Sequence, residues 1–129
     1  MHPFNAEAGA IPAPSDPLAI AVTEQSARLL WRAVPYFEAR YGERGRRFGL
    51  SDAGWLTTLG ALPSSVRLAQ IDWLAAVLSP RGIPSWLLEL QLVALARLGA
   101  RRGFGAASAM NEGALHLALR RQSLLTDRD

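Results

Sequence analysis

Cysteine is absent from the 129 residues, and histidine occurs only twice, as His2 and His116. These absences exclude disulfides, thiolate zinc sites, iron–sulfur clusters and cysteine nucleophiles, and nearly exclude a multi-histidine metal site. Valine and isoleucine are also scarce, whereas alanine and leucine are the commonest residues. Because β-branched residues favour strands while alanine and leucine favour helices, this balance predicts an all-α protein.

Lysine is absent as well, so all the basic residues are arginine. The net charge is only +3, yet the sequence pI is about 10.5. With no lysine to titrate, little positive charge is lost above about pH 8 until the tyrosines ionise. The high pI therefore reflects the missing lysines rather than a strong positive field, and it is weak evidence for nucleic-acid binding.

Long hydrophobic runs are missing too. No apolar stretch reaches the roughly 18 residues of a membrane-spanning helix, and the N-terminal segment lacks the pattern of a signal peptide. We therefore expect a cytoplasmic protein with no membrane partner. Several prolines and no apolar period predict a flexible, Pro-rich arm over 1–15, followed by a compact single-domain helical bundle over 16–126.

Apolar periodicity and turn residues divide the rest of the chain into about five helices. The first should begin near Pro17, with Ser15 or Asp16 as its N-cap. Its apolar stripe keeps its phase across Pro35, so we expect a kink at that proline. The alternative is that the helix ends near Ala33 and a new one begins at Pro35.

The next boundary is marked by glycines. Gly42, Gly45 and Gly49 predict a break in the chain, after which Ser51 should cap a helix that ends near Leu62. Three further helices are expected over about 64–78, 84–100 and 106–125.

The core is predicted from apolar residues at helical spacing, namely Leu30, Val34, Phe37, Trp55, Leu59, Ile71, Leu74, Leu78, Leu90, Leu95 and Leu117. Four tryptophans are spread one to a helix over the first four helices. We expect them to fill the same core, the alternative being a shared pocket for a flat ligand. They are Trp31, Trp55, Trp73 and Trp86.

The densest group of unusual residues lies in segment 40–48. Its arginines are candidates for binding an anion or a partner, because a guanidinium recognises phosphate and carboxylate with two parallel hydrogen bonds. Tyr41 and Phe48 could stack a base. The alternative is a helix end whose arginines pair with Glu38, Glu43 or Asp52. The four arginines are Arg40, Arg44, Arg46 and Arg47.

No constellation for catalysis is evident. His116 stands alone on a helix, which is more typical of a structural residue than of a base or a metal ligand. Glu89 lies on a very apolar helix, and we expect it to be partly buried and paired with Arg67 or Arg97. We therefore expect no catalytic residues, no metal and no cofactor, and we consider an enzyme less probable than a binding protein.

The helix over 84–100 is apolar nearly all round, which predicts a central position or an interface. We expect Trp86, Leu87 and Leu90 to contribute to an interface, either with a second copy in a homodimer or with another protein. The first hypothesis is thus a non-catalytic protein–protein interaction module, such as an accessory subunit, adaptor or assembly factor. The alternatives are a nucleic-acid-binding regulator that uses segment 40–48, and a small-molecule or cofactor sensor with a tryptophan-lined pocket.

Overall fold

The computed structural model describes residues 16–126, and within that range it contains helices and no strand. The all-α prediction is confirmed. The predicted arm over 1–15 lies outside the described residues. The helices are α1 (Pro17–Ala33), α2 (Pro35–Thr58), the short η2 (Leu59–Ala61), α3 (Ser64–Leu78), the short η3 (Ser79–Arg81), α4 (Ser85–Arg101) and α5 (Ala107–Thr126).

The start of α1 is as predicted. The Asp16 side chain caps it by accepting a hydrogen bond from the backbone N–H of Leu18 at 3.1 Å, and Pro17 occupies the first turn. The expected kink at Pro35 is wrong, because α1 ends at Ala33 and α2 begins at Pro35. Val34 between them has φ −127° and ψ 78°, as expected for a residue whose helical conformation is opposed by the following proline ring.

Within α2, the single non-helical residue is Gly42, with φ 61° and ψ −152°. This positive φ suits glycine, and it divides α2 into a short first part and a longer second part, so the bundle has six helices rather than five. The chain then stays helical through Gly45 and Gly49. The prediction that Ser51 caps a new helix is therefore wrong: Ser51 lies inside α2.

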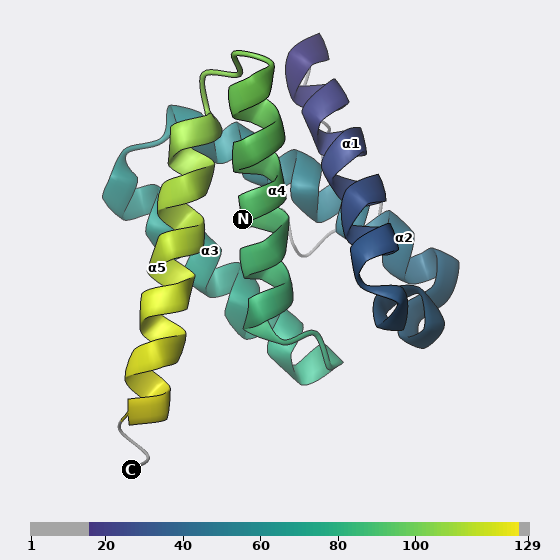
Figure 1. The fold of residues 1–129 in the computed structure, drawn as a ribbon. Helices are drawn as coiled ribbons and strands as arrows, with labels where there is room; N and C mark the ends of the chain where they lie inside the picture. Colours follow the sequence, from purple (N-terminus) through teal and green to yellow (C-terminus); the bar gives the residue numbers. More distant parts are fainter. Residues whose placement is uncertain (1–15, 127–129) are drawn as a thin grey trace.

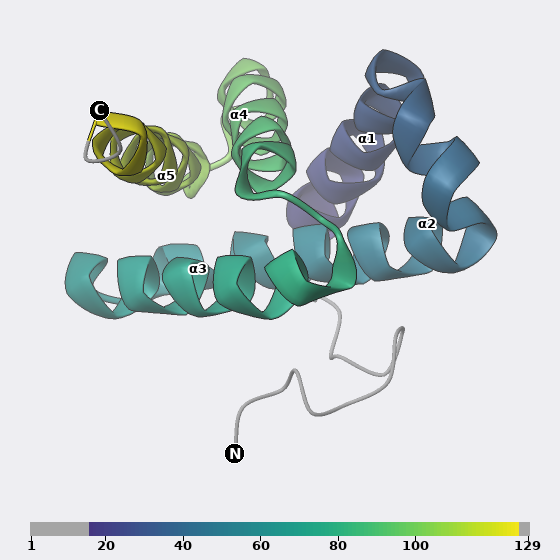
Figure 2. The same ribbon diagram turned by 90° about the horizontal axis from the view of Figure 1, so that it is seen from below.

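The helices form two layers. Figure 1 shows α1, α4 and α5 side by side, with α4 in the middle. Figure 2 shows the second part of α2 and helix α3 beneath them, running across the first layer. The core lies between the layers and is built mainly from leucine, with Ile71, Trp55 and Met110 among its larger members.

Most of the predicted core residues are buried: Leu30, Trp55, Leu59, Ile71, Leu74, Leu78, Leu95 and Leu117. Val34 is half-buried, and the side chain of Phe37 lies outside what is described. Leu90 is the error, since 40 % of it is exposed. On a helix that is apolar nearly all round, the pattern does not say which side faces the core, and in α4 that side belongs to Leu88, Leu92 and Leu95.

Between residues 16 and 126, no helix combines the length and the apolar character needed to cross a bilayer.

Candidate functional site

The four arginines of segment 40–48 are spread over different surroundings, because the segment is helical on both sides of Gly42. The Arg40 guanidinium lies 5.6 Å from the centre of the Tyr41 ring. The Arg46 guanidinium lies 5.0 Å from the centre of the Trp31 ring on α1, a cation–π contact that joins the two helices. Arg44 lines a pocket, and Arg47 is exposed. The segment is therefore not one continuous loop around an anion.

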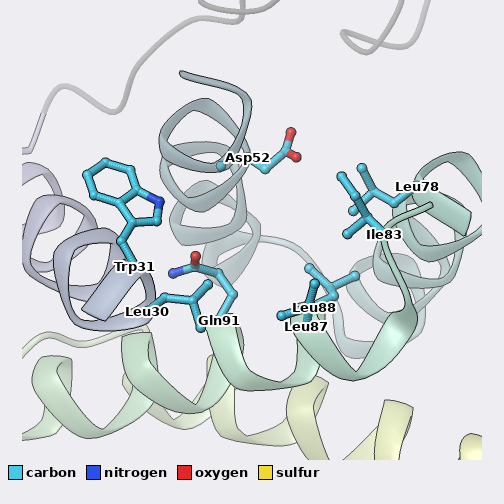
Figure 3. Close-up of a pocket in the computed structure, with 9 residues that line it drawn as sticks. Leu30, Trp31, Asp52, Leu78, Ile83, Leu87, Leu88 and Gln91 are labelled. Atoms are coloured by element: carbon cyan, nitrogen blue, oxygen red, sulfur yellow. The ribbon is translucent and has the colours of Figure 1, made fainter. Parts of the chain in front are cut away.

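The first of two adjoining pockets lies where the end of α1, the second part of α2 and the start of α4 meet (Figure 3). Its volume of about 40 Å³ is enough for a few water molecules. Figure 3 shows Trp31, Asp52 and Gln91 reaching it from three different helices. The complete lining is Leu30, Trp31, Gly49, Asp52, Leu78, Ile83, Leu87, Leu88 and Gln91.

Asp52 is the ionisable residue of this pocket. Burial raises the pKa of its carboxyl group from 3.8 to about 7, and the positive charge of Arg81 opposes part of that rise. Arg81, whose charge acts on Asp52, belongs to η3 and was not among the arginines expected to pair with this residue. Its carboxyl group changes charge near neutral pH.

The second pocket lies between α2 and the turn that follows η3. Its volume is about 130 Å³, and it shares Leu78 and Ile83 with the first pocket. The hydroxyl of Tyr41 donates a hydrogen bond to the carbonyl of Gly82, which fixes the ring against the turn. Two arginines, Arg44 of α2 and Arg81 of η3, are among the residues that line it. Its lining residues are Tyr41, Arg44, Gly45, Leu78, Arg81 and Ile83.

The predicted interface residues on α4 separate into two kinds. Trp86 and Leu90 are exposed over 42 % and 40 % of their surfaces, whereas Leu87 is buried and lines the Asp52 pocket. Trp86 and Leu90 are one helical turn apart, so they share one side of α4.

The four tryptophans do not all fill one core, contrary to the prediction, and neither of the two pockets described above is lined by more than one of them. Trp55 belongs to the core, Trp73 packs against it, and Trp86 is exposed. Trp31 is the one tryptophan that lines either of the two pockets described above. A flat ligand held among several tryptophans is therefore not supported by this arrangement.

A polar network between α3 and α5 was not expected from the sequence. The His116 Nε2 atom lies 2.9 and 3.0 Å from the two carboxylate oxygens of Asp72, and Arg120 contacts the same carboxylate at 2.6 Å. Glu112 accepts hydrogen bonds from Ser64 at 2.7 Å and from Arg67 at 2.8 Å. These contacts hold α5 against α3, which gives His116 a structural partner.

Glu89 is buried, as predicted, but its partner differs from the prediction. Its two carboxylate oxygens accept hydrogen bonds from Arg121 of α5 at 2.8 and 3.2 Å. The expected partners Arg67 and Arg97 lie elsewhere: Arg67 pairs with Glu112, and Arg97 points outward from α4. The true partner, Arg121, is adjacent to Glu89 only because α5 packs on α4.

Within residues 16–126, no three or more histidine, aspartate or glutamate side chains gather into a possible metal site. The fold and these surfaces define a two-layer all-α protein with an apolar outer helix side and two small pockets. No family model, no curated protein and no solved structure matches the chain.

Proposed function

We propose that this chain is a non-catalytic protein–protein interaction module, and that it binds through the outer side of α4. The observation that carries the proposal is the exposure of Trp86 and Leu90 on a helix in which the neighbouring Glu89 and Gln91 are buried. Glu89 and Gln91, the polar residues beside them, are only 8 % and 5 % exposed. A helix on the surface of a monomer normally has the opposite arrangement.

Glu89 and Gln91 of α4 make contacts within the protein. Glu89 binds Arg121 on α5, and the Gln91 side chain donates a hydrogen bond to the Ser26 hydroxyl on α1 at 2.9 Å. Trp86 and Leu90 are exposed, and Figure 2 shows that none of α1, α2, α3 and α5 lies over the outer side of α4. Large aromatic and aliphatic side chains in such a place are typical of the centre of a binding surface.

One side of α4 carries a stripe with the spacing of a helix-binding surface. Trp86, Leu90, Val93 and Arg97 follow one another at steps of four, three and four residues, which keeps them on one side of the helix. Three of the four are exposed, and Val93 is half-buried because it also packs against the core. The stripe is about 16 Å long at the usual helical rise. It therefore fits the apolar side of another α-helix.

The occupant that we propose is a second copy of the chain, with the two α4 helices antiparallel. The stripe is symmetric about the point between Leu90 and Val93. In an antiparallel pair each Leu90 would face Val93 of the second copy, and each Trp86 would face Arg97. Both contacts are favourable, the first apolar and the second a cation–π pair, and a two-fold axis repeats them.

Gel filtration coupled to light scattering tests this proposal. At about 100 μM the protein should elute as a dimer, and the double variant Trp86→Ser/Leu90→Ser should elute as a monomer because it loses the centre of the contact. The matched control is Leu115→Ser/Leu119→Ser, which removes two leucines that are each 58 % exposed on α5. This control should remain a dimer.

Two results would count against the proposal. A wild-type protein that is monomeric at this concentration and purifies alone would contradict it. A dimer that both double variants weaken equally would place the contact away from α4. Salt-dependent binding of DNA or RNA, lost on replacing Arg40 and Arg47, would then favour the nucleic-acid alternative.

A further inference from the structure

We propose that the pocket lined by Asp52 is a pH-sensitive contact, which is closed when the Asp52 carboxyl group is neutral and opens more readily when that group is ionised. The contact holds α2 against the end of α1 and the start of α4. It lies on the inner side of α4, away from Trp86 and Leu90. It requires neither a second copy nor another protein, so it can be correct whether or not the chain dimerises.

Asp52 differs from the other acidic side chains that lie between helices. Asp72, Glu89 and Glu112 each have an arginine nitrogen within 2.6–2.8 Å. Within residues 16–126, the Asp52 carboxyl group accepts no hydrogen bond, and Arg81 acts on it through its charge. A buried carboxyl group without a hydrogen-bonding partner favours its neutral form, because ionisation there carries a large desolvation cost.

The surroundings of this carboxyl group are mostly apolar. Figure 3 shows Asp52 between Trp31 on one side and Ile83 and Leu78 on the other. Arg81 of η3 is the charged group that acts on it, and this charge opposes only part of the effect of burial, so the pKa of the carboxyl group is raised to about 7. The other elements contribute uncharged side chains, namely Leu30 and Trp31 from α1, Leu78 from α3, Ile83 from the turn before α4, and Leu87, Leu88 and Gln91 from α4.

The closed pocket offers little to an ionised carboxylate. Its volume of about 40 Å³ has room for water, but a buried water needs two or more polar partners. Gln91 is the polar side chain that α4 contributes, and its amide nitrogen already donates to the Ser26 hydroxyl at 2.9 Å. Ionisation of Asp52 therefore favours a state in which α2 moves away from α4 and the carboxylate is hydrated from outside.

The size of the effect follows from the difference in proton affinity between the closed and the open pocket. The pKa of Asp52 is about 7 in the closed pocket, and it returns toward 3.8 when the pocket opens to water. The closed form binds the proton more tightly, so opening becomes easier as the pH rises. The equilibrium constant for opening should rise about tenfold between pH 6 and pH 8 and level off above that range.

Native-state hydrogen exchange of the full chain, followed by NMR, tests this contact. A local opening exposes amides without unfolding the whole protein, so exchange through it does not depend on low concentrations of urea. We expect the amides of residues 49–56 and 83–91 to exchange in this way, about tenfold faster at pH 8 than at pH 6 after correction for the intrinsic effect of pH on exchange. Asp52→Asn should abolish the difference. The matched control Asp72→Asn, which removes a carboxylate paired with His116 and Arg120, should keep it.

The indole N–H signal of Trp31, assigned with Trp31→Phe, gives a second measurement, because this ring lines the pocket. In the wild type it should shift with a midpoint near pH 7, and in Asp52→Asn it should not. Three results would overturn the proposal: equal corrected exchange at pH 6 and pH 8, a rise that persists in Asp52→Asn, or exchange of these amides that depends on urea as steeply as that of the core amides of α5. Trp86→Ser/Leu90→Ser should keep the pH dependence, which separates this test from that of the α4 surface.

Discussion

The two sides of α4 are built from the same kind of residue and have opposite surroundings. Leu88, Leu92 and Leu95 are buried against the second layer, whereas Trp86 and Leu90 are exposed. Because both sides are apolar, hydrophobicity alone does not explain which of them forms the core. The neighbours decide it: α1 and α5 lie on the flanks of α4, α2 and α3 cover its inner side, and no helix of residues 16–126 covers its outer side (Figure 2).

The largest expected difference between these sides is in stability. Leu92→Ala should lower the free energy of unfolding by about 2–5 kcal/mol, because it leaves a cavity in a close-packed core. Leu90→Ala should lower it by less than about 1 kcal/mol, because much of that side chain is already in water. Urea unfolding at low protein concentration, where no dimer forms, measures both. Equal losses would show that the two sides do not differ as described.

The second prediction concerns Asp52, which the inner residues of α4 help to bury. Its pKa is raised from 3.8 in the unfolded chain to about 7 in the folded protein, so folding favours the protonated form. This group therefore lowers stability progressively as the pH rises through that interval, and its effect levels off above it.

Replacing Asp52 should remove that effect. Asp52→Asn should be more stable than the wild type at pH 8, by on the order of 2–4 kcal/mol, and equally stable below about pH 4. Urea unfolding across this pH range provides the measurement. If the difference in free energy of unfolding between Asp52→Asn and the wild type is the same at all pH values, the pKa of Asp52 is not raised by folding, which would contradict this prediction.

A third prediction sharpens the contrast between closely packed and open positions. A Cβ atom on Gly60 would lie 2.5 Å from the Cβ of Ala106 and 3.4 Å from its Cα, so it would press on the backbone before α5. Gly60→Ala should therefore cost about 1–3 kcal/mol. Gly105→Ala is the control, because nothing lies within 4 Å of that position. Thermal unfolding should separate the two variants, and a similar melting temperature for both would contradict the packing described.

The smallest predicted effect belongs to the polar contacts between α3 and α5. Hydrogen bonds from Ser64 and Arg67 hold the pKa of Glu112 below its ordinary value of 4.5. The ionised form therefore stabilises the fold above that value, and the contribution is lost as the pH falls through the lowered pKa. Glu112→Gln should reduce this acid sensitivity slightly. Acid unfolding, followed as the pH is lowered, measures this difference. If the curves of the wild type and Glu112→Gln coincide, the contacts of Glu112 with Ser64 and Arg67 add no stability.

Much of the fold was predictable because it rests on local signals. The cap at Asp16 and the limits of α3, α4 and α5 follow from side chains close in sequence. The two errors in α2 have a common cause. A proline or a glycine marks a place where a helix can end, but the surrounding packing determines whether the helix ends there. A helix boundary occurs at Pro35, whereas α2 continues through Gly49.

The candidate site was less predictable, since it depends on contacts between distant segments. The sequence identified Trp86 and Leu90 as candidate interface residues and Arg44 as a candidate ligand-binding residue. It did not indicate that Arg81 would join Arg44 at one pocket, or that the charge of Arg81 would act on Asp52. Nor could the pairing of Glu89 with Arg121 be found before α5 was placed beside α4.

The most direct test of the α4 surface uses the absence of cysteine from the chain. A single cysteine introduced by Leu90→Cys can be linked only to the same residue in a second copy by a short bis-maleimide reagent. We predict covalent dimers for Leu90→Cys at micromolar concentration and none for Leu115→Cys, whose leucine is exposed on α5. Equal cross-linking of the two variants, or none for Leu90→Cys, would contradict the proposal that the outer side of α4 binds a second copy.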